Sequence, residues 1–244
     1  MRRFALLGGA IVVVAALPWL ITTPYWRGIL VLCAMNVLLA MALNLVLGYT
    51  GQLNLGQSAF FAIGAYVTTI LVKTYQWNFW LAALAAIAAA GVVGLALVVY
   101  WLMDNLVRSP VGVTLRAIRE DEVSAASLGV KSALWKAFAF SLGAGIAALA
   151  GCFYPGFVGT LVPDAFNIIE SFTMMAMVIV GGMGTMIGPV IGAVVLTFLP
   201  ELLRGFGELR LMIYGIALTL VVLFMPGGIV QAWHSSVGKM RRRP

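Results

Sequence analysis

Long uncharged apolar runs alternate with short polar stretches along the whole chain. Eight such runs stand out, with Glu170 as the one charged residue inside them: Phe4–Thr22, Gly28–Leu47, Gln57–Val72, Phe79–Met103, Ala137–Pro155, Ile168–Met183, Met186–Pro200 and Leu211–Met225. A helix needs about 20 apolar residues to cross a bilayer. The pattern therefore predicts an all-α, polytopic membrane protein with about eight transmembrane helices, forming a single transmembrane domain over residues 1–244.

Composition identifies lipid as the solvent of this chain. Hydrophobic residues make up 63% of it and charged residues 9%, whereas a soluble domain averages roughly 45–50% and about 25%. So little charge cannot cover a water-facing surface, which excludes soluble enzymes, disordered chains and nucleic-acid-binding domains. The formal net charge of +7 is then typical of basic loops beside a bilayer, and we predict no nucleic-acid partner.

The basic residues predict how the helices are oriented. With eight crossings and the N-terminus inside, eleven of the fifteen Lys and Arg residues lie on the cytoplasmic side, and Arg27, Lys73, Arg204 and Arg210 lie outside. This asymmetry agrees with the positive-inside rule, so we predict that both termini are cytoplasmic. The first apolar run is longer than the core of a signal peptide, which favours a retained first helix.

One extended polar segment, residues 104–136, lies in the cytoplasm in this topology. The composition of Val113–Leu128 favours a helix that Gly129 caps, with Leu115, Ile118, Ala125 and Leu128 as a partial apolar stripe. Its charged and small residues are Arg116, Arg119, Glu120, Asp121, Glu122, Ala125, Ala126 and Gly129. Small side chains permit close approach and charges select a partner, so the segment suits docking into a cytoplasmic protein. An ordinary solvated loop is the alternative.

Two glycine-rich segments interrupt the apolar runs, and we name them the first and second glycine breaks. The first contains Gly48, Thr50, Gly51, Gln52, Asn54, Gly56 and Gln57, and the second contains Gly181, Gly182 and Gly184. Non-helical backbone at membrane depth must be buried in protein or line a wet cavity, because lipid cannot satisfy its polar groups. Such breaks are typical of solute paths. A plain cytoplasmic turn is an equal alternative for the first, and Gly188-x-x-x-Gly192 favours close helix packing after the second.

Candidate chemistry is sparse. Cys33 and Cys152 lie inside apolar runs and His234 is the single histidine, so neither a disulfide framework nor a metal site is predicted. Asn36, Asn44 and Glu170 are the polar residues deepest in apolar sequence. Glu170 lies near the start of its run, and the lack of any other acid or base within a run argues against proton- or sodium-coupled transport. We predict no catalytic residue, no cofactor and no metal, and the chain has no phosphate-binding loop.

Three separated motifs resemble the branched-chain amino-acid ABC transporter permeases, in the order that family shows. GYTGQLNLGQSAFFAIGAYV lies at Gly48–Val67, LRAIREDEVSAASLGV at Leu115–Val130, and VIVGGMGTMIGPVIGAVVL at Val178–Leu196. The last is followed by the family's usual Pro-Glu-Leu-Leu at Pro200–Leu203. Two departures are visible: members usually carry a longer middle before the second motif, and Val123 stands where the general permease motif has Glu.

The resemblance implies a function and a set of partners. It implies an inner-membrane permease subunit that carries leucine, isoleucine and valine, with a second homologous permease, two ATP-binding subunits and an extracytoplasmic solute-binding protein. The 113–130 segment would dock on the ATPase, and the two glycine breaks would line the solute path. Relatives that carry urea or short amides share the motifs. The sequence leaves three competing hypotheses open: a channel-like protein or secondary carrier working without ATP, a membrane enzyme, and a shortened, inactive paralogue.

Overall fold

A computed structural model of the chain describes residues 24–74, 95–158, 166–206 and part of the positions between 209 and 231. Within these ranges all regular structure is helical, which confirms the all-α prediction. The first predicted run, Phe4–Thr22, and most of the runs Phe79–Met103 and Leu211–Met225 lie outside the described residues. The count of eight crossings, the single domain and the cytoplasmic termini therefore stay predictions.

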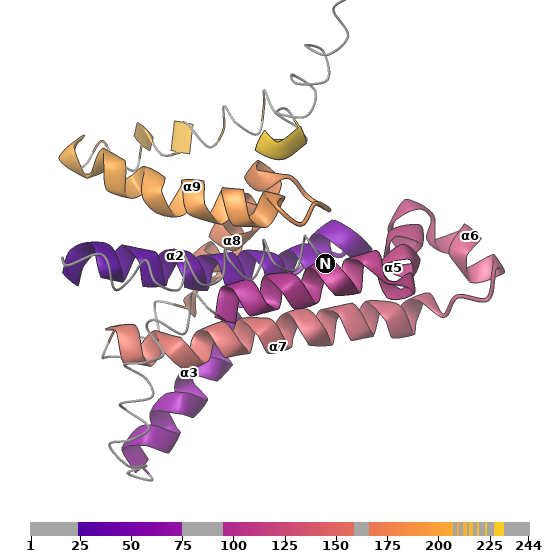
Figure 1. The fold of residues 1–244 in the computed structure, drawn as a ribbon, viewed down its shortest axis with the longest axis horizontal. Helices are drawn as coiled ribbons and strands as arrows, with labels where there is room; N and C mark the ends of the chain where they lie inside the picture. Colours follow the sequence, from indigo (N-terminus) through magenta and orange to yellow (C-terminus); the bar gives the residue numbers. More distant parts are fainter. Residues whose placement is uncertain are drawn as a thin grey trace, which may run out of the picture.

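The helices form a bundle with the charged segment at one end (Figure 1). In chain order they are α2 (Pro24–Leu43), the π-helical turn η1 (Asn44–Gly48), α3 (Gln57–Thr74), the helical residues 95–108, α5 (Pro110–Glu120), α6 (Glu122–Ser127), α7 (Ser132–Val158), α8 (Ile168–Gly181), α9 (Gly188–Leu202) and the short 3-10 turn η3 (Leu203–Phe206). Tyr25–Gly48 and Ser132–Val158 are long and apolar enough to cross a membrane. Three shorter apolar helices match the predicted runs that begin near residues 57, 168 and 186.

Helix α2 is the centre of the bundle, where it packs against α7, α8 and α9. Its second half is buried on every side, and Met35, Leu38, Leu39 and Leu43 are among the largest fully buried side chains. In lipid, close packing and interhelical hydrogen bonds hold helices together, because burying apolar surface from lipid tails gains little. One such bond joins the side chains of Asn36 on α2 and Thr197 on α9 at 3.0 Å.

Glycines set how closely the outer helices approach. A Cβ added at Gly64 of α3 would overlap the carbonyl of Ala148, and one at Gly151 of α7 would overlap the carbonyl of Phe61. At the α8–α9 contact, a Cβ at Gly192 would overlap the carbonyl of Met177. This last approach confirms the close packing that Gly188-x-x-x-Gly192 predicts.

The charged segment differs from the single helix predicted over 113–128. It forms two helices, α5 and α6, that meet at Asp121, whose backbone is extended at φ −155° and ψ 106°. The Asp121 carboxylate accepts hydrogen bonds from the backbone of Val123 and Ser124, so it acts as an N-cap and starts a new helix. The helix end at Gly129 is confirmed: φ is +85°, and the Gly129 and Val130 N–H groups donate back to Ala126 and Ala125, as in a Schellman motif.

The α3–α7 crossing gives a direct test of glycine packing. We expect Gly151→Ala to lower the melting temperature of the detergent-solubilised protein, because its methyl group would force the two backbones apart at a cost of roughly 1–3 kcal/mol. Gly145→Ala is the matched control, since it lies in the same helix and its Cβ would meet nothing within 4 Å. Equal melting temperatures for the two variants would contradict the crossing.

Candidate functional site

The two glycine breaks, far apart in sequence, lie against each other. The Asn44 side chain joins them: its Nδ2 donates to the Thr185 carbonyl at 2.9 Å, and its Oδ1 accepts from the Gly184 N–H at 3.0 Å. A Cβ at Gly48 would lie 2.7 Å from the Gly184 nitrogen, so glycine permits this approach. The amide nitrogen and the amide oxygen of Asn44 therefore both bind the second break, and together they hold it against the first.

Asn44 lies where the regular helix α2 changes into the π-helical turn η1. Single π-turns are frequent at functional sites, because they leave backbone groups that another segment must satisfy. Asn44 is 2% exposed, and its two bonds satisfy polar atoms that would otherwise be buried alone. The sequence shows Asn44 as a polar residue in an apolar run but not as part of the candidate site, because its partners are 140 residues away.

The side chain of Arg119, on α5, also reaches the contact between the two glycine breaks. One of its guanidinium nitrogens, Nη1, donates to the Gly48 carbonyl. A Cβ at Gly184 would lie 2.5 Å from that nitrogen, and Gly51 lies beside the arginine stem. Gly51 and Gly184 have φ values of +72° and +75°, which glycine adopts without strain. We call the group formed by Asn44, Gly48, Arg119, Gly184 and Thr185 the glycine junction; it combines residues predicted separately for solute path and for coupling.

Beyond the junction, the first break continues into the bundle as non-helical chain. The first residues of α3 reach α8, where the Ser58 N–H donates to the Ser171 hydroxyl oxygen at 3.1 Å and the two hydroxyls are 2.9 Å apart. Ser171 and Gly181 are ten residues apart on α8, or about 15 Å. The segment from Gly51 to Gln57 connects these two contacts. Asn54 and Gln57 are buried in it, whereas Gly51, Leu53, Leu55 and Gly56 are exposed, so the protein encloses the amides but not the whole segment.

Buried amides line this non-helical segment. Asn54 Nδ2 donates to Gln57 Oε1 at 2.8 Å, and Asn54 Oδ1 accepts from the Gly56 N–H at 3.0 Å. Gln57 is 0% exposed, and its Nε2 has no hydrogen-bond partner among the described residues. A buried donor without a partner is costly, so Gln57 offers a free N–H pair to any polar group that enters. The sequence predicted Asn54 and Gln57 here but not Ser58 or Ser171.

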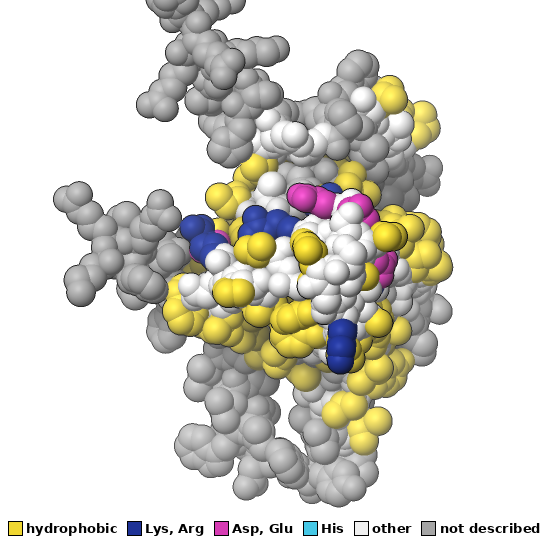
Figure 2. All heavy atoms as spheres, turned by 90° about the vertical axis from the view of Figure 1, so that its right-hand side faces the viewer, with side chains coloured by type: hydrophobic (Ala, Val, Ile, Leu, Met, Phe, Trp, Pro, Cys, Tyr) yellow, Lys and Arg dark blue, Asp and Glu magenta, His cyan; other side chains and the backbone are white. Residues whose placement is uncertain are grey.

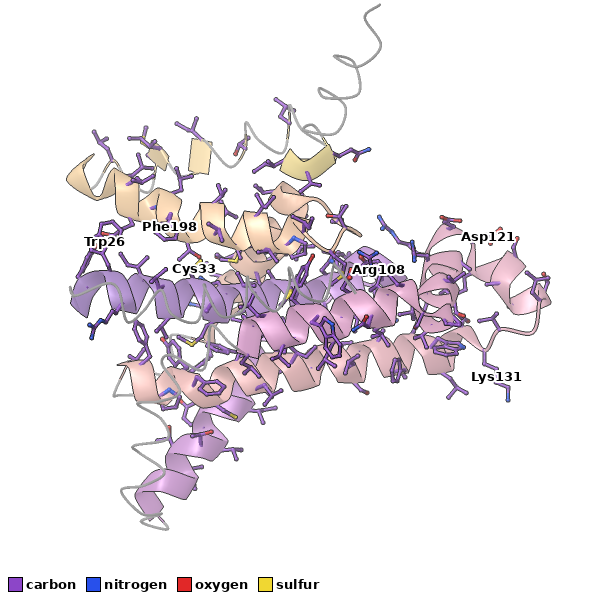
Figure 3. All side chains as sticks on the ribbon, viewed as in Figure 1. Trp26, Cys33, Arg108, Asp121, Lys131 and Phe198 are labelled. Atoms are coloured by element: carbon purple, nitrogen blue, oxygen red, sulfur yellow. The ribbon has the colours of Figure 1, made fainter. Side chains whose placement is uncertain are left out.

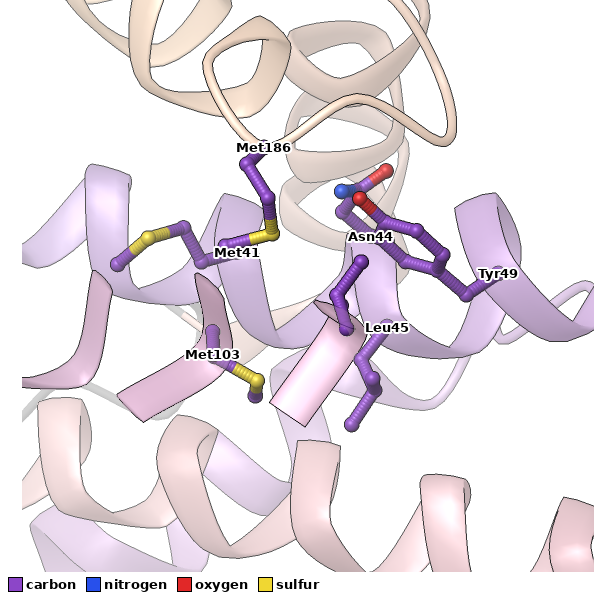
Figure 4. A pocket seen from close by; sticks show the side chains of 7 residues that line it. Met41, Asn44, Leu45, Tyr49, Met103 and Met186 are labelled. Atoms are coloured by element: carbon purple, nitrogen blue, oxygen red, sulfur yellow. The ribbon is translucent and has the colours of Figure 1, made fainter. Parts of the chain in front are cut away.

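The glycine junction is tightly packed in this structure. Next to it lies a cavity of about 10 Å³, lined by three methionines and by Asn44, Leu45, Tyr49 and Val107 (Figure 4). That volume holds about one water molecule, so an amino acid does not fit. The methionine lining comes from three separate parts of the chain, Met41, Met103 and Met186, and unbranched thioether side chains adapt readily to changes of shape.

The α5–α6 end carries charged and apolar side chains on its exposed surface (Figures 2 and 3). Leu115, Ile118 and Ala125 are buried against the protein, whereas Ala126 and Gly129 are exposed. Leu128, the last member of the predicted partial apolar stripe, is 85% exposed and lies just beyond α6 as its C-cap residue. Val123 is 79% exposed.

The acids of this end are held in their charged form. Hydrogen bonds from the Ser124 hydroxyl and backbone lower the pKa of Asp121, and those from Lys136 and Ser132 lower the pKa of Glu122. Glu122 and Lys136 also form an ion pair that joins α6 to α7. An open hollow of about 470 Å³ lies beside this pair and extends to Gln52 of the first break. Glu120 is exposed on the same end.

No metal site is visible among the described residues, where no three His, Cys, Asp or Glu side chains lie together. A helical bundle with interrupted helices that meet at a polar junction is instead the architecture of membrane transporters.

The comparisons with known proteins agree with this architecture. The family described as branched-chain amino acid transport system / permease component matches residues 25–103 and 95–223. The chain belongs to this family of membrane transport permeases. No solved structure matches it.

The individual relatives are also named as transport permeases. The chain is 32% identical to the high-affinity branched-chain amino acid transport system permease protein LivM of Salmonella typhimurium and of Escherichia coli K12, over 130 residues that cover 53% of this chain and 31% of each relative. It is also 32% identical over 114 residues to the autoinducer 2 import system permease protein LsrC of Salmonella typhi, covering 45% of this chain and 32% of that one. The matches thus span about a third of these relatives.

The junction predicts a large effect of Asn44→Leu. The substitution leaves the Gly184 N–H and the Thr185 carbonyl, both in half-buried residues, without these partners, so we expect a total loss of roughly 1–3 kcal/mol in stability. Thermal unfolding in detergent measures it. Asn36→Leu is the matched control, because it removes one bond between two side chains of α2 and α9. A smaller loss for Asn44→Leu than for Asn36→Leu would disprove the role of Asn44.

Proposed function

We propose that this chain is the transmembrane permease subunit of an ATP-driven importer for branched-chain, hydrophobic amino acids in the cell inner membrane. Family membership and the names of the LivM relatives support the transport system and the solute. The observation that carries the proposal is the glycine junction, where the charged 113–130 segment contacts the two breaks of the membrane helices. A surface that receives force from an ATPase must be connected in this way to the part of the protein that opens.

The segment 113–130 has the surface that such docking needs. Its apolar side, Leu115, Ile118 and Ala125, fixes it to the bundle, while Val123, Ala126 and Leu128 are available to a partner. Charged side chains beside an apolar contact set orientation and partner choice. This chain has no phosphate-binding loop, so ATP hydrolysis belongs to separate subunits. The partners we propose are a second homologous permease, two ATP-binding subunits and an extracytoplasmic solute-binding protein.

The solute path we propose follows the first break between the junction and the Ser58–Ser171 contact. Asn54 and Gln57 supply uncharged donors and acceptors that suit the polar ends of a zwitterion, with apolar side chains around them for the rest of the solute. The relative LsrC is named for another solute, autoinducer 2. The second candidate is a permease for urea or short amides, because the resemblance of the three motifs extends to relatives that carry these solutes. A carrier or channel independent of ATP is less well supported, since Arg119 is the one charged residue of the junction.

Docking is tested first by co-purification of the tagged protein, co-expressed with the genes beside its own. We expect an ATP-binding subunit to co-purify, and deletion of Arg116–Gly129 to abolish its recovery. Ala126→Arg should reduce recovery about tenfold or more while membrane insertion is unchanged, because a long charged side chain blocks close approach. Asn105→Arg adds the same charge at an exposed position outside residues 113–130. Equal recovery with both variants would contradict the docking surface.

The path is tested by uptake of radiolabelled leucine into proteoliposomes that contain the whole complex. We expect Asn54→Leu to impair uptake, because it removes the amide that binds Gln57 and Gly56. Leu53→Ala, at an exposed neighbouring position, should transport normally. Competition by unlabelled isoleucine, valine, urea and acetamide identifies the solute class. Unchanged uptake by Asn54→Leu at matched protein levels would show that the first break is a structural turn and does not line the path.

A further inference from the structure

We propose that Arg119 is a positioning residue that clamps the two glycine breaks together, and that withdrawal of its guanidinium from the Gly48 carbonyl frees the breaks to separate. The proposal rests on the proposed function, in which the α5–α6 end receives the motion of an ATPase. In this proposal one side chain, that of Arg119, connects the motion of the ATPase to opening of the solute path.

Arg119 is distinct from the other two arginines of the 104–136 segment. Arg108 forms an ion pair with Asp104 one helical turn away, at 2.8 Å. Arg116 donates to the carbonyls of Val107 and Gly112, at 2.8 and 3.2 Å, within its own part of the chain. Arg119 alone among the three donates to a glycine break, which is 71 residues away in sequence.

The Gly48 carbonyl is a favourable partner for a cation. Gly48 ends η1, and the last carbonyls of a helix carry partial negative charge and lack partners in the helix. A hydrogen bond from an ionised donor is about twice as strong as a neutral one. Among the described residues no carboxylate forms an ion pair with Arg119, so its charge is directed at the break itself.

The shape of the junction fits a removable clamp. The guanidinium occupies the space that a side chain at position 184 would take, and the stem lies over Gly51. Arg119 is itself an exposed residue at the last turn of α5, so its guanidinium can leave the Gly48 carbonyl through a change of side-chain conformation or a small movement of the end of α5. Asn44 then stays as the only amide bridge between the breaks among the residues that the structure describes. Two side chains therefore hold the junction together. Asn44 is buried within the bundle, whereas Arg119 is exposed at the α5–α6 end, where a partner controls its position.

The test measures opening of the junction in the full-length chain in membrane vesicles. Cys33 and Cys152 are replaced by alanine, and Thr50→Cys supplies a reporter thiol at a position in the first break that is 3% exposed. A small water-soluble maleimide labels this thiol when the breaks separate. We expect Arg119→Met to raise the labelling rate about tenfold, the change that loss of one charge-assisted bond produces in an equilibrium. Arg119→Lys, which keeps the positive charge, should restore most of the protection.

Arg108→Met is the matched control, because it removes the same charge from the same segment without touching a break. We expect its labelling rate and the parental rate to agree. A parental rate for Arg119→Met would overturn the clamp, and so would an equal increase in both methionine variants, which would indicate a general effect of charge. Melting temperatures of the three variants within a few degrees of the parent show that the fold persists; a collapsed Arg119→Met with intact Arg119→Lys would assign Arg119 to folding and also overturn the proposal.

A second readout separates the clamp from the proposed function. In the reconstituted complex, we expect leucine transported per ATP hydrolysed to fall about fivefold or more in Arg119→Met, measured on complexes that retain the ATPase. Loss of co-purification in the parent would refute the ATPase partner and leave the labelling result standing. Normal transport per ATP in Arg119→Met would overturn the clamp and leave the partner standing.

Discussion

One amide, that of Asn44, satisfies two backbone groups of a segment 140 residues away, and this contact holds the two glycine breaks together. A helix that stops inside a membrane protein exposes N–H and C=O groups that lipid cannot bind. Here each break supplies part of what the other lacks, and the absence of side chains at Gly48 and Gly184 lets the two backbones approach closely enough for one side chain to serve both. The two interrupted helices are therefore joined as a pair through Asn44.

The charged segment is physically connected to the two glycine breaks. The segment is attached through buried apolar residues of α5 and α6, through the ion pair to α7, and through Arg119 to the junction. The cavity beside the junction has room for about one water molecule. Methionines line that volume, which suits a place where packing has to change during a cycle.

The sequence predicted the helices well where one physical rule decides, and less well where several compete. Apolar runs such as Ile168–Met183 yielded helices within a few residues of their predicted limits, because local signals mark the ends: Asn167 caps the start of α8 and Gly182, at φ +122°, ends it. The division at Asp121 was missed: helix propensity and capping favour different structures there, and the local hydrogen bonds to Val123 and Ser124 determine the outcome. Asn44 was visible as an isolated polar residue, but its partners depend on tertiary structure. The proximity of Arg119 to Gly48 likewise has no local signal in the sequence.

Exposed apolar residues in α6 and at its C-terminal end affect how much of this protein accumulates in a cell. Val123 and Leu128 are more than three-quarters exposed in the isolated chain, at the end of the bundle that lies in water in the proposed topology. Chaperones and proteases recognise exposed apolar surface, and they continuously remove proteins that display it. A copy without its partner would carry such a signal permanently, whereas an assembled copy would hide it. Subunit balance would then be enforced by degradation of the excess, with no need for matched synthesis.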